Sequence, residues 1–205
     1  MAVDLPALVA PWRAAVVTSE IQNGVIGDQA VLPVLAKAAR TVVPAIARLV
    51  RSARAASVEV VHCTFERRID GKGANSNAAL FHGADRSPVR LLSGSHEAQV
   101  VPEVGVEPTD LVLPRTHGLG PMAGTGLDPV LRNLGVSTVI VVGVSVNVAI
   151  PNLVMDAVNR GYDVVLPRDA VCGVPAEYAD AVIDNTLRLL ATVTTVDDLV
   201  DIWKD

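Results

Sequence analysis

The pattern of hydrophobic and polar residues predicts strands that alternate with helices along the chain. Its strongest element is Thr138–Val144, an almost unbroken run of Val and Ile, which is typical of a strand buried on both faces of a parallel sheet. Past Gly143 the apolar residues recur at helical spacing, with Asn147 as the expected N-cap and Pro151 in the first turn. We therefore expect the central strand to run into a helix whose first N–H groups form an anion or oxyanion site.

The same reasoning predicts the other elements. Further strands are expected at residues 14–19, 58–64, 111–114, 162–167 and 191–195. Helices are expected at residues 126–134, 176–190 and 196–203. Residues 35–56 are predicted to form one helix or two joined at Pro44, Thr125 is a candidate cap, and residues 1–13 are expected to be irregular because of Pro6 and Pro11.

Together these elements predict an α/β fold with three layers, α/β/α, built on a mostly parallel, Rossmann-like sheet of about six strands. No linker divides the 205 residues, so we expect one domain over residues 1–205. Residues 65–99 lack sustained periodicity and are expected to form a flap. The basic residues of segment 35–56, Arg54 among them, are expected to form a solvated face.

Composition narrows the classes of function. Half of the residues are hydrophobic but only 3% are aromatic, so the core is expected to consist of Val, Leu, Ile and Ala. A net charge of −5 gives no basic field for nucleic acid or anionic membranes, and neither is expected as a partner. No apolar run is long enough to span a bilayer, no signal sequence is evident, and a cytoplasmic location is expected. The apolar content and the long flap predict a homo-oligomer.

Several polar residues are candidates for chemistry. Glu20 and Gln22 follow the strand predicted at residues 14–19, at the end of the sheet where α/β proteins place their sites, and His117 lies in the loop after residues 111–114. Cys63 lies in a predicted strand and Cys172 in the loop expected after the strand at residues 162–167. Both lack metal or redox spacing and are expected to be reduced and structural. The histidines lack metal-ligand spacing and no phosphate loop is present, so we expect no metal and no cofactor. The pocket expected at the strand ends predicts a small-molecule substrate.

Three segments in order resemble those of the isochorismatase-like hydrolase superfamily, the cysteine hydrolases that include nicotinamidases and related amidases. AAVVTSEIQNG at residues 14–24 is similar to the first strand of that family with its D-x-Q-N signature. GPMAGTGLDPVLRNLGV at residues 120–136 is similar to the S-A-F-x-G-T-x-L-D segment. GVSVNVAIPNLVMDAVNRGYDVVLPRDA at residues 143–170 is similar to G-V-x-x-x-x-C-V with the A-x-x-x-G-Y and D-A that follow it.

The resemblance implies a site with altered residues. In the family a Cys attacks a carbonyl, an Asp takes and returns its proton, and a Lys holds the Asp. The matching positions here are Glu20 for the Asp, Arg115 for the Lys and Ala149 for the Cys. A methyl group forms no thioester, so covalent amidase chemistry at Ala149 is excluded. The resemblance also places the Ser145 amide in an oxyanion hole, after a peptide bond that is often cis in the family.

Three interpretations follow. The first is a hydrolase without a cysteine nucleophile, in which Glu20 is the general acid or base for a vinyl ether, ester or amide and Arg115 is its partner or a carboxylate anchor. In that case the amides of Ser145 and Ala149 hold the anion, with Asn147, His117 and Gln22 as further candidates for substrate binding. The second is a catalytically silent protein that binds a small molecule or serves assembly. The third moves the nucleophile to Ser145 or Cys172, and the first is the working hypothesis.

Overall fold

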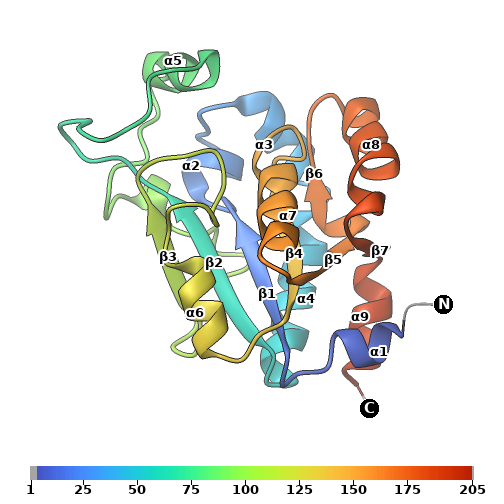
Figure 1. Cartoon of the computed structure of the whole chain (residues 1–205). Helices are drawn as coiled ribbons and strands as arrows, with labels where there is room; N and C mark the ends of the chain where they lie inside the picture. The colour runs from blue at the N-terminus through green and yellow to red at the C-terminus, as the bar shows by residue number, and fades with distance from the viewer. Residues whose placement is uncertain (1–3, 205) are drawn as a thin grey trace.

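The computed structural model describes residues 4–204, and its centre is a twisted sheet in which every strand pair is parallel (Figure 1). Within these residues the sheet has seven strands in the order β3-β2-β1-β4-β5-β7, and β6 pairs with the end of β4. All six predicted strands are present, and the two-residue strand β6 is a seventh. The strands are β1 (Ala14–Ser19), β2 (Glu59–Phe65), β3 (Leu111–Arg115), β4 (Thr138–Val144), β5 (Asp163–Pro167), β6 (Val171–Cys172) and β7 (Thr192–Thr194).

Helices cover both faces of the sheet, so the predicted three-layer α/β/α fold is confirmed. One core packs α4 and α9 on the sheet, and the other packs α6, α7 and α8 on the opposite face (Figure 1). The α-helices are α1 (Leu5–Leu8), α2 (Asn23–Ile26), α3 (Pro33–Ala39), α4 (Val43–Ala55), α5 (Ala79–Arg86), α6 (Leu127–Asn133), α7 (Ala149–Asn159), α8 (Ala176–Asn185) and α9 (Val196–Ile202). Short 3₁₀ turns occur at His96–Ala98, Arg168–Ala170 and Leu187–Leu189. Across residues 4–204, no helix combines the length and apolarity that a membrane crossing requires.

The central strand β4 forms as its sequence predicts. All seven of its residues are buried, with Ile140 and Val142 in the core beneath α4 and α9 and Val139 and Val141 in the opposite core. Each such side chain contributes about 1.5–3 kcal/mol by leaving water. Gly143 permits the close approach of β1 here, because a Cβ at this position would lie 2.3 Å from the Ser19 carbonyl oxygen, at a φ of +110°. The glycine therefore fixes where the strand turns toward the site.

Several boundaries differ from the predictions for identifiable reasons. Segment 35–56 is two helices, and Pro44 lies in the first turn of α4, where its missing N–H costs nothing. Residues 1–13 include the short helix α1, because Pro6 is also in a first turn and Asp4 caps it. Helix α6 begins after Gly126 as N-cap, although the Thr125 hydroxyl accepts the Leu127 N–H at 3.1 Å.

Two further predictions were wrong at the site end of the sheet. Asn147 is not the N-cap of α7, since Val148 occupies that position. The Asn147 side chain instead accepts the Val174 N–H at 2.9 Å and donates to the Val174 carbonyl, so both the oxygen and the nitrogen of its amide are hydrogen-bonded. Cys172 was expected in a loop but belongs to β6, which two bridges to Gly143 and Val144 hold against β4.

The segment between β2 and β3 leaves the body of the molecule. It contains α5, which projects at the upper left of Figure 1 and has no buried residue. The segment returns along the sheet through bridges between Arg67 and Leu92 and between Gln22 and Val100. The predicted flap at residues 65–99 begins at the last residue of β2 and otherwise lies within this segment.

Candidate active site

A cavity of about 180 Å³ lies where β1, β2, β3 and β4 end, beneath α5 and the turn between α2 and α3. Its wall is mostly apolar. The lining residues are Glu20, Val25, Val31, Leu32, Leu35, Phe65, Arg67, Ala74, Asn75, Leu80, Phe81, Ala84, Leu91, Arg115, Gly118, Leu119, Ser145, Val148 and Ala149. The carboxyl ends of parallel strands are the usual position of a ligand site in an open α/β sheet.

Glu20 is held at this edge by its own backbone. It follows the last residue of β1 and has a φ of +55°, which is uncommon for a residue with a side chain. Its N–H donates to the Cys63 carbonyl at 3.0 Å, so the end of β2 fixes this conformation. Backbone conformations of this kind cost about 1–3 kcal/mol and persist where neighbouring structure imposes them. The result is a carboxylate that lines the cavity and is 20% exposed.

Arg115 is the partner of this carboxylate. It is the last residue of β3, its side chain is 4% exposed, and its Nη2 donates to Oε1 of Glu20. Its Cζ lies 5.3 Å from the centroid of the Phe65 ring, and among the described residues Nε and Nη1 have no hydrogen-bond acceptor. The charge of a guanidinium this deeply buried is therefore balanced by Glu20 and the face of Phe65.

The turn between β4 and α7 supplies backbone donors. Ser145 and Ala149 both line the cavity, and among the described residues neither backbone N–H has an acceptor. Ala149 is the first residue of the eleven-residue helix α7, so the positive end of the helix dipole lies at the cavity. The bond between Val144 and Ser145 is cis, and the Ser19 hydroxyl donates to the Val144 carbonyl at 3.1 Å. These N–H groups can hold an anion or a developing oxyanion.

The structure brings together four of the candidate residues, Glu20, Arg115, Ser145 and Ala149, and places the other three elsewhere. Gln22 is fully buried, and its side-chain amide is hydrogen-bonded to backbone groups. Its Nε2 donates to the Phe65 and Ala98 carbonyls at 2.8 and 2.7 Å, and its Oε1 accepts the Phe65 N–H. It thus ties the end of β2 to the 3₁₀ turn His96–Ala98. The Asn147 side chain is bound to Val174, as described above.

His117 is the third candidate outside the lining. Its ring lies against Gly124, whereas its neighbours Gly118 and Leu119 reach the cavity. The residues that sequence reasoning missed are Arg67 and the apolar wall, including Phe65 and Phe81. A signal for the last two was present, because they are the only two phenylalanines of the chain and both line this one cavity.

Neither cysteine lines the cavity. Burial raises the pKa of the Cys63 thiol to about 12, although the Arg115 charge opposes the shift. Burial also raises the pKa of Cys172 to about 11. Both thiols are therefore protonated at neutral pH, which is the opposite of what a nucleophilic cysteine needs. The lining contains no histidine that could activate the Ser145 hydroxyl.

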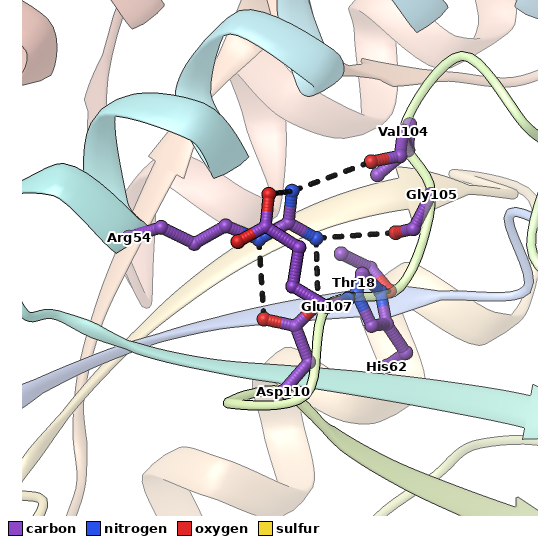
Figure 2. A network of polar contacts seen from close by, with 7 residues as sticks. All are labelled: Thr18, Arg54, His62, Val104, Gly105, Glu107 and Asp110. Carbon is purple, nitrogen blue, oxygen red and sulfur yellow. Dashed lines mark hydrogen bonds and ion pairs between the residues drawn. The ribbon is translucent and has the colours of Figure 1, made fainter.

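A second polar cluster lies away from the cavity, on the α4 side of the sheet (Figure 2). Nδ1 of His62 is 2.9 Å from the Thr18 hydroxyl, and its Nε2 is 3.3 Å from Oδ2 of Asp110. Arg54 donates to Asp110 through Nε and Nη2, at 3.1 and 2.6 Å, and to the carbonyls of the loop that carries Val104 and Gly105.

The order hydroxyl, imidazole, carboxylate resembles a catalytic triad, but Thr18 and His62 are completely buried and Asp110 is 1% exposed. Burial lowers the pKa of His62, so its ring is neutral in the folded protein. The cluster is therefore structural, and it corrects the expectation that Arg54 lies on a solvated face. Within residues 4–204, no group of three His, Cys, Asp or Glu residues is arranged to hold a metal ion.

Comparison with known proteins gives consistent matches. A family model described as an isochorismatase domain matches residues 14–198. The ureidoacrylate amidohydrolase RutB of Agrobacterium fabrum is 25% identical over 210 residues, which cover 94% of this chain and 91% of that protein. The structure is similar to that of a cysteine hydrolase from Pseudomonas syringae, with a TM-score of 0.83, 24% identity and coverage of 96% and 95% of the two chains. An isochorismatase family protein from Desulfovibrio vulgaris gives a TM-score of 0.79, 27% identity and coverage of 94% and 98%.

Proposed function

The chain belongs to the isochorismatase family, and from this premise we propose that it hydrolyses an amide or ester bond of a small molecule without a cysteine nucleophile. Glu20 acts as the general base and Arg115 holds it in place. The observation that carries the proposal is the Glu20–Arg115 ion pair, set in the wall of a mostly apolar cavity beside two backbone N–H groups that have no acceptor among the described residues. The family and the relative named an amidohydrolase support hydrolysis as the reaction class.

The ion pair favours a base over an acid. A guanidinium stays charged at any relevant pH and carries donors only, so Glu20 is the acceptor in their contact. An ionised Glu20 can accept a proton from water, whereas protonation of a vinyl ether requires the neutral acid. Amides and esters are therefore the favoured substrates among the three bond types.

The proposed reaction uses one water molecule. Its oxygen bonds to the carbonyl carbon while its proton passes to Glu20. The N–H groups of Ser145 and Ala149 donate to the oxyanion that forms on the carbonyl oxygen. The bond from carbon to the leaving nitrogen or oxygen then breaks, and Glu20 returns the proton to the leaving group. Ala149 lines the cavity, and its small side chain leaves more room for the water than a larger side chain would.

The test is turnover by the protein and by Glu20→Gln, with a panel of small amides, esters and vinyl ethers. Glu66→Gln is the matched control, because Glu66 follows β2 close to the site and does not line the cavity. We expect Glu20→Gln to lower kcat by about 10²-fold or more, the usual contribution of a positioned base, and Glu66→Gln to leave it unchanged. Equal turnover by both variants would remove Glu20 from the mechanism.

The competing interpretation is a catalytically silent protein that binds a small molecule or serves assembly. Absence of turnover from the whole panel by correctly folded protein would favour it. The variant Ala149→Cys then shows whether such a protein lacks only the nucleophile or lacks the rest of the catalytic site as well. A thiol at the first turn of α7 would have a lowered pKa, and new amidase activity that iodoacetamide abolishes would indicate that the remaining site is intact.

A further inference from the structure

Three ionisable residues line the cavity, and two of them neutralise each other. Glu20 and Arg115 form the ion pair described above, which leaves Arg67 as the third. The Arg67 side chain is 15% exposed, and its Nη1 pairs with Asp85, a residue outside the lining. Among the described residues, Nε and Nη2 of Arg67 have no acceptor. The wall of the cavity therefore carries a cation with unused donors.

The backbone of Arg67 is hydrogen-bonded to the returning segment, whereas its partner lies on an exposed helix. The Arg67 N–H donates to the Leu91 carbonyl at 2.7 Å, and its own carbonyl accepts the Ser93 N–H at 3.0 Å. The Asp85 side chain is 39% exposed and lies on α5, a helix without a buried residue. A guanidinium held rigidly beside a partner on a weakly anchored helix can exchange that partner for another carboxylate with little change in the sheet.

The rest of the wall is apolar. Leu80 and Phe81 of α5 face the cavity together with Phe65, and the opposite side includes Val25 and Leu35. A volume of about 180 Å³ is slightly larger than a cavity of about 150 Å³ that holds a benzene molecule. The space thus suits one compact apolar group, such as a ring with one or two small substituents.

We propose that the cavity selects ligands with one apolar body and one carboxylate, and that Arg67 holds the carboxylate while the bond to be hydrolysed lies toward Glu20. This assignment rests on the proposed function for the identity of that bond. A carboxylate on Arg67 forms two parallel hydrogen bonds of the kind that guanidinium groups make best. The apolar body is buried against the two phenylalanines. The incoming carboxylate competes with Asp85 for the same guanidinium.

Binding can be measured without turnover. The probe is benzoate, with benzyl alcohol as a neutral ligand of the same size and acetate as a carboxylate without an apolar body, titrated into the full chain by calorimetry. We expect benzoate to bind at least tenfold more tightly than either. Arg67→Gln should remove that advantage and leave benzyl alcohol unchanged. Arg68→Gln is the matched control, since its side chain is 61% exposed and paired with Asp70, and it should bind benzoate as the unmodified protein does.

Asp85→Asn distinguishes an anchor from a structural pair. Removal of the competing carboxylate should tighten benzoate binding several-fold, whereas a pair that merely shapes the wall would make Asp85→Asn and Arg67→Gln equally harmful. The proposal is overturned if both variants weaken benzoate binding alike, or if Arg67→Gln binds it normally. Should Arg67→Gln fail to fold, Arg67→Lys keeps the charge and loses the fork, and intermediate affinity is then expected.

Turnover separates this proposal from the proposed function. We expect 4-carbamoylbenzoate to be hydrolysed with at least a tenfold lower KM than 4-acetylbenzamide, a neutral analogue whose amide is its one hydrolysable bond, with the difference lost in Arg67→Gln. Glu20-dependent hydrolysis with equal KM values would refute the anchor and retain the hydrolase. Arg67-dependent binding of benzoate without hydrolysis of any amide would retain the anchor and refute the hydrolase.

Discussion

The buried cluster around Asp110 allows a comparison of two ion pairs made by the same helix. Arg48 and Arg54 both lie on α4, and each pairs with an aspartate that is distant in sequence. The Arg54–Asp110 pair has side-chain exposures of 10% and 1%, whereas the Arg48–Asp197 pair has exposures of 46% and 73%. The perturbation is removal of each carboxylate, by Asp110→Ala and Asp197→Ala.

The expected magnitudes follow from burial. Asp110 accepts both contacts from Arg54, the Glu107 N–H at 2.7 Å and a contact from His62, so its loss leaves a buried guanidinium without its main counterion. Breaking a buried pair from one side costs about 3–5 kcal/mol. Loss of an exposed pair costs about 0–1 kcal/mol, because water already solvates both groups. Asp110→Asn, which keeps the shape and an accepting oxygen, should fall between the two.

The assay is equilibrium unfolding in urea near pH 7, with the free energy of unfolding extrapolated to water for each variant. A loss of about 3 kcal/mol or more for Asp110→Ala and of less than about 1 kcal/mol for Asp197→Ala would agree with the argument. Similar losses for the two variants would refute it, because burial would then not be what makes the Arg54 pair important.

Three further predictions concern single residues. Burial keeps the pKa of His62 below its ordinary 6.5 despite the Asp110 carboxylate, so the unfolded chain binds a proton that the folded chain does not. The free energy of unfolding should therefore fall as the pH drops from about 7.5 to about 5.5. The fall should be smaller in His62→Gln. Gly143→Ala places a Cβ 2.3 Å from the Ser19 carbonyl oxygen and should cost more than about 3 kcal/mol in chemical unfolding. The control Gly135→Ala, where φ is also positive but space is open, should cost only about 1–2 kcal/mol, and equal costs would contradict the steric argument. Gln22→Ala removes three hydrogen bonds to backbone groups and should lower the thermal midpoint through a loss of about 2–4 kcal/mol; an unchanged midpoint would show that water replaces them.

The features that could be predicted from sequence are local. The run of Val and Ile in β4 predicts a strand buried on both faces without any knowledge of its neighbours. The motifs around Glu20 and Ala149 likewise place both residues at the ends of strands. Arg115 was matched to the family lysine by its place in the chain, and in the structure it contacts Glu20.

The features that could not be predicted depend on distant partners. Arg54 has the spacing of a solvated helix residue, and only the fold reveals that Asp110, 56 positions away, lies beneath it. Asn147 has the residue type and position of a cap, but Val174 offers it two bonds in place of one. The extent of the domain, the cytoplasmic location and the homo-oligomer stay predictions.

The cavity draws its two kinds of residue from two different parts of the fold. The ion pair and the amide donors lie at strand ends, where the buried core of the sheet holds them, whereas Leu80, Phe81 and Ala84 come from α5, which buries no residue of its own. Substitutions in α5 therefore change the shape of the cavity at little cost in folding energy. Changes in this one segment can therefore alter which substrates the cavity accepts without altering the residues proposed for chemistry. This makes α5 the segment to randomise in a library selected for activity on new substrates.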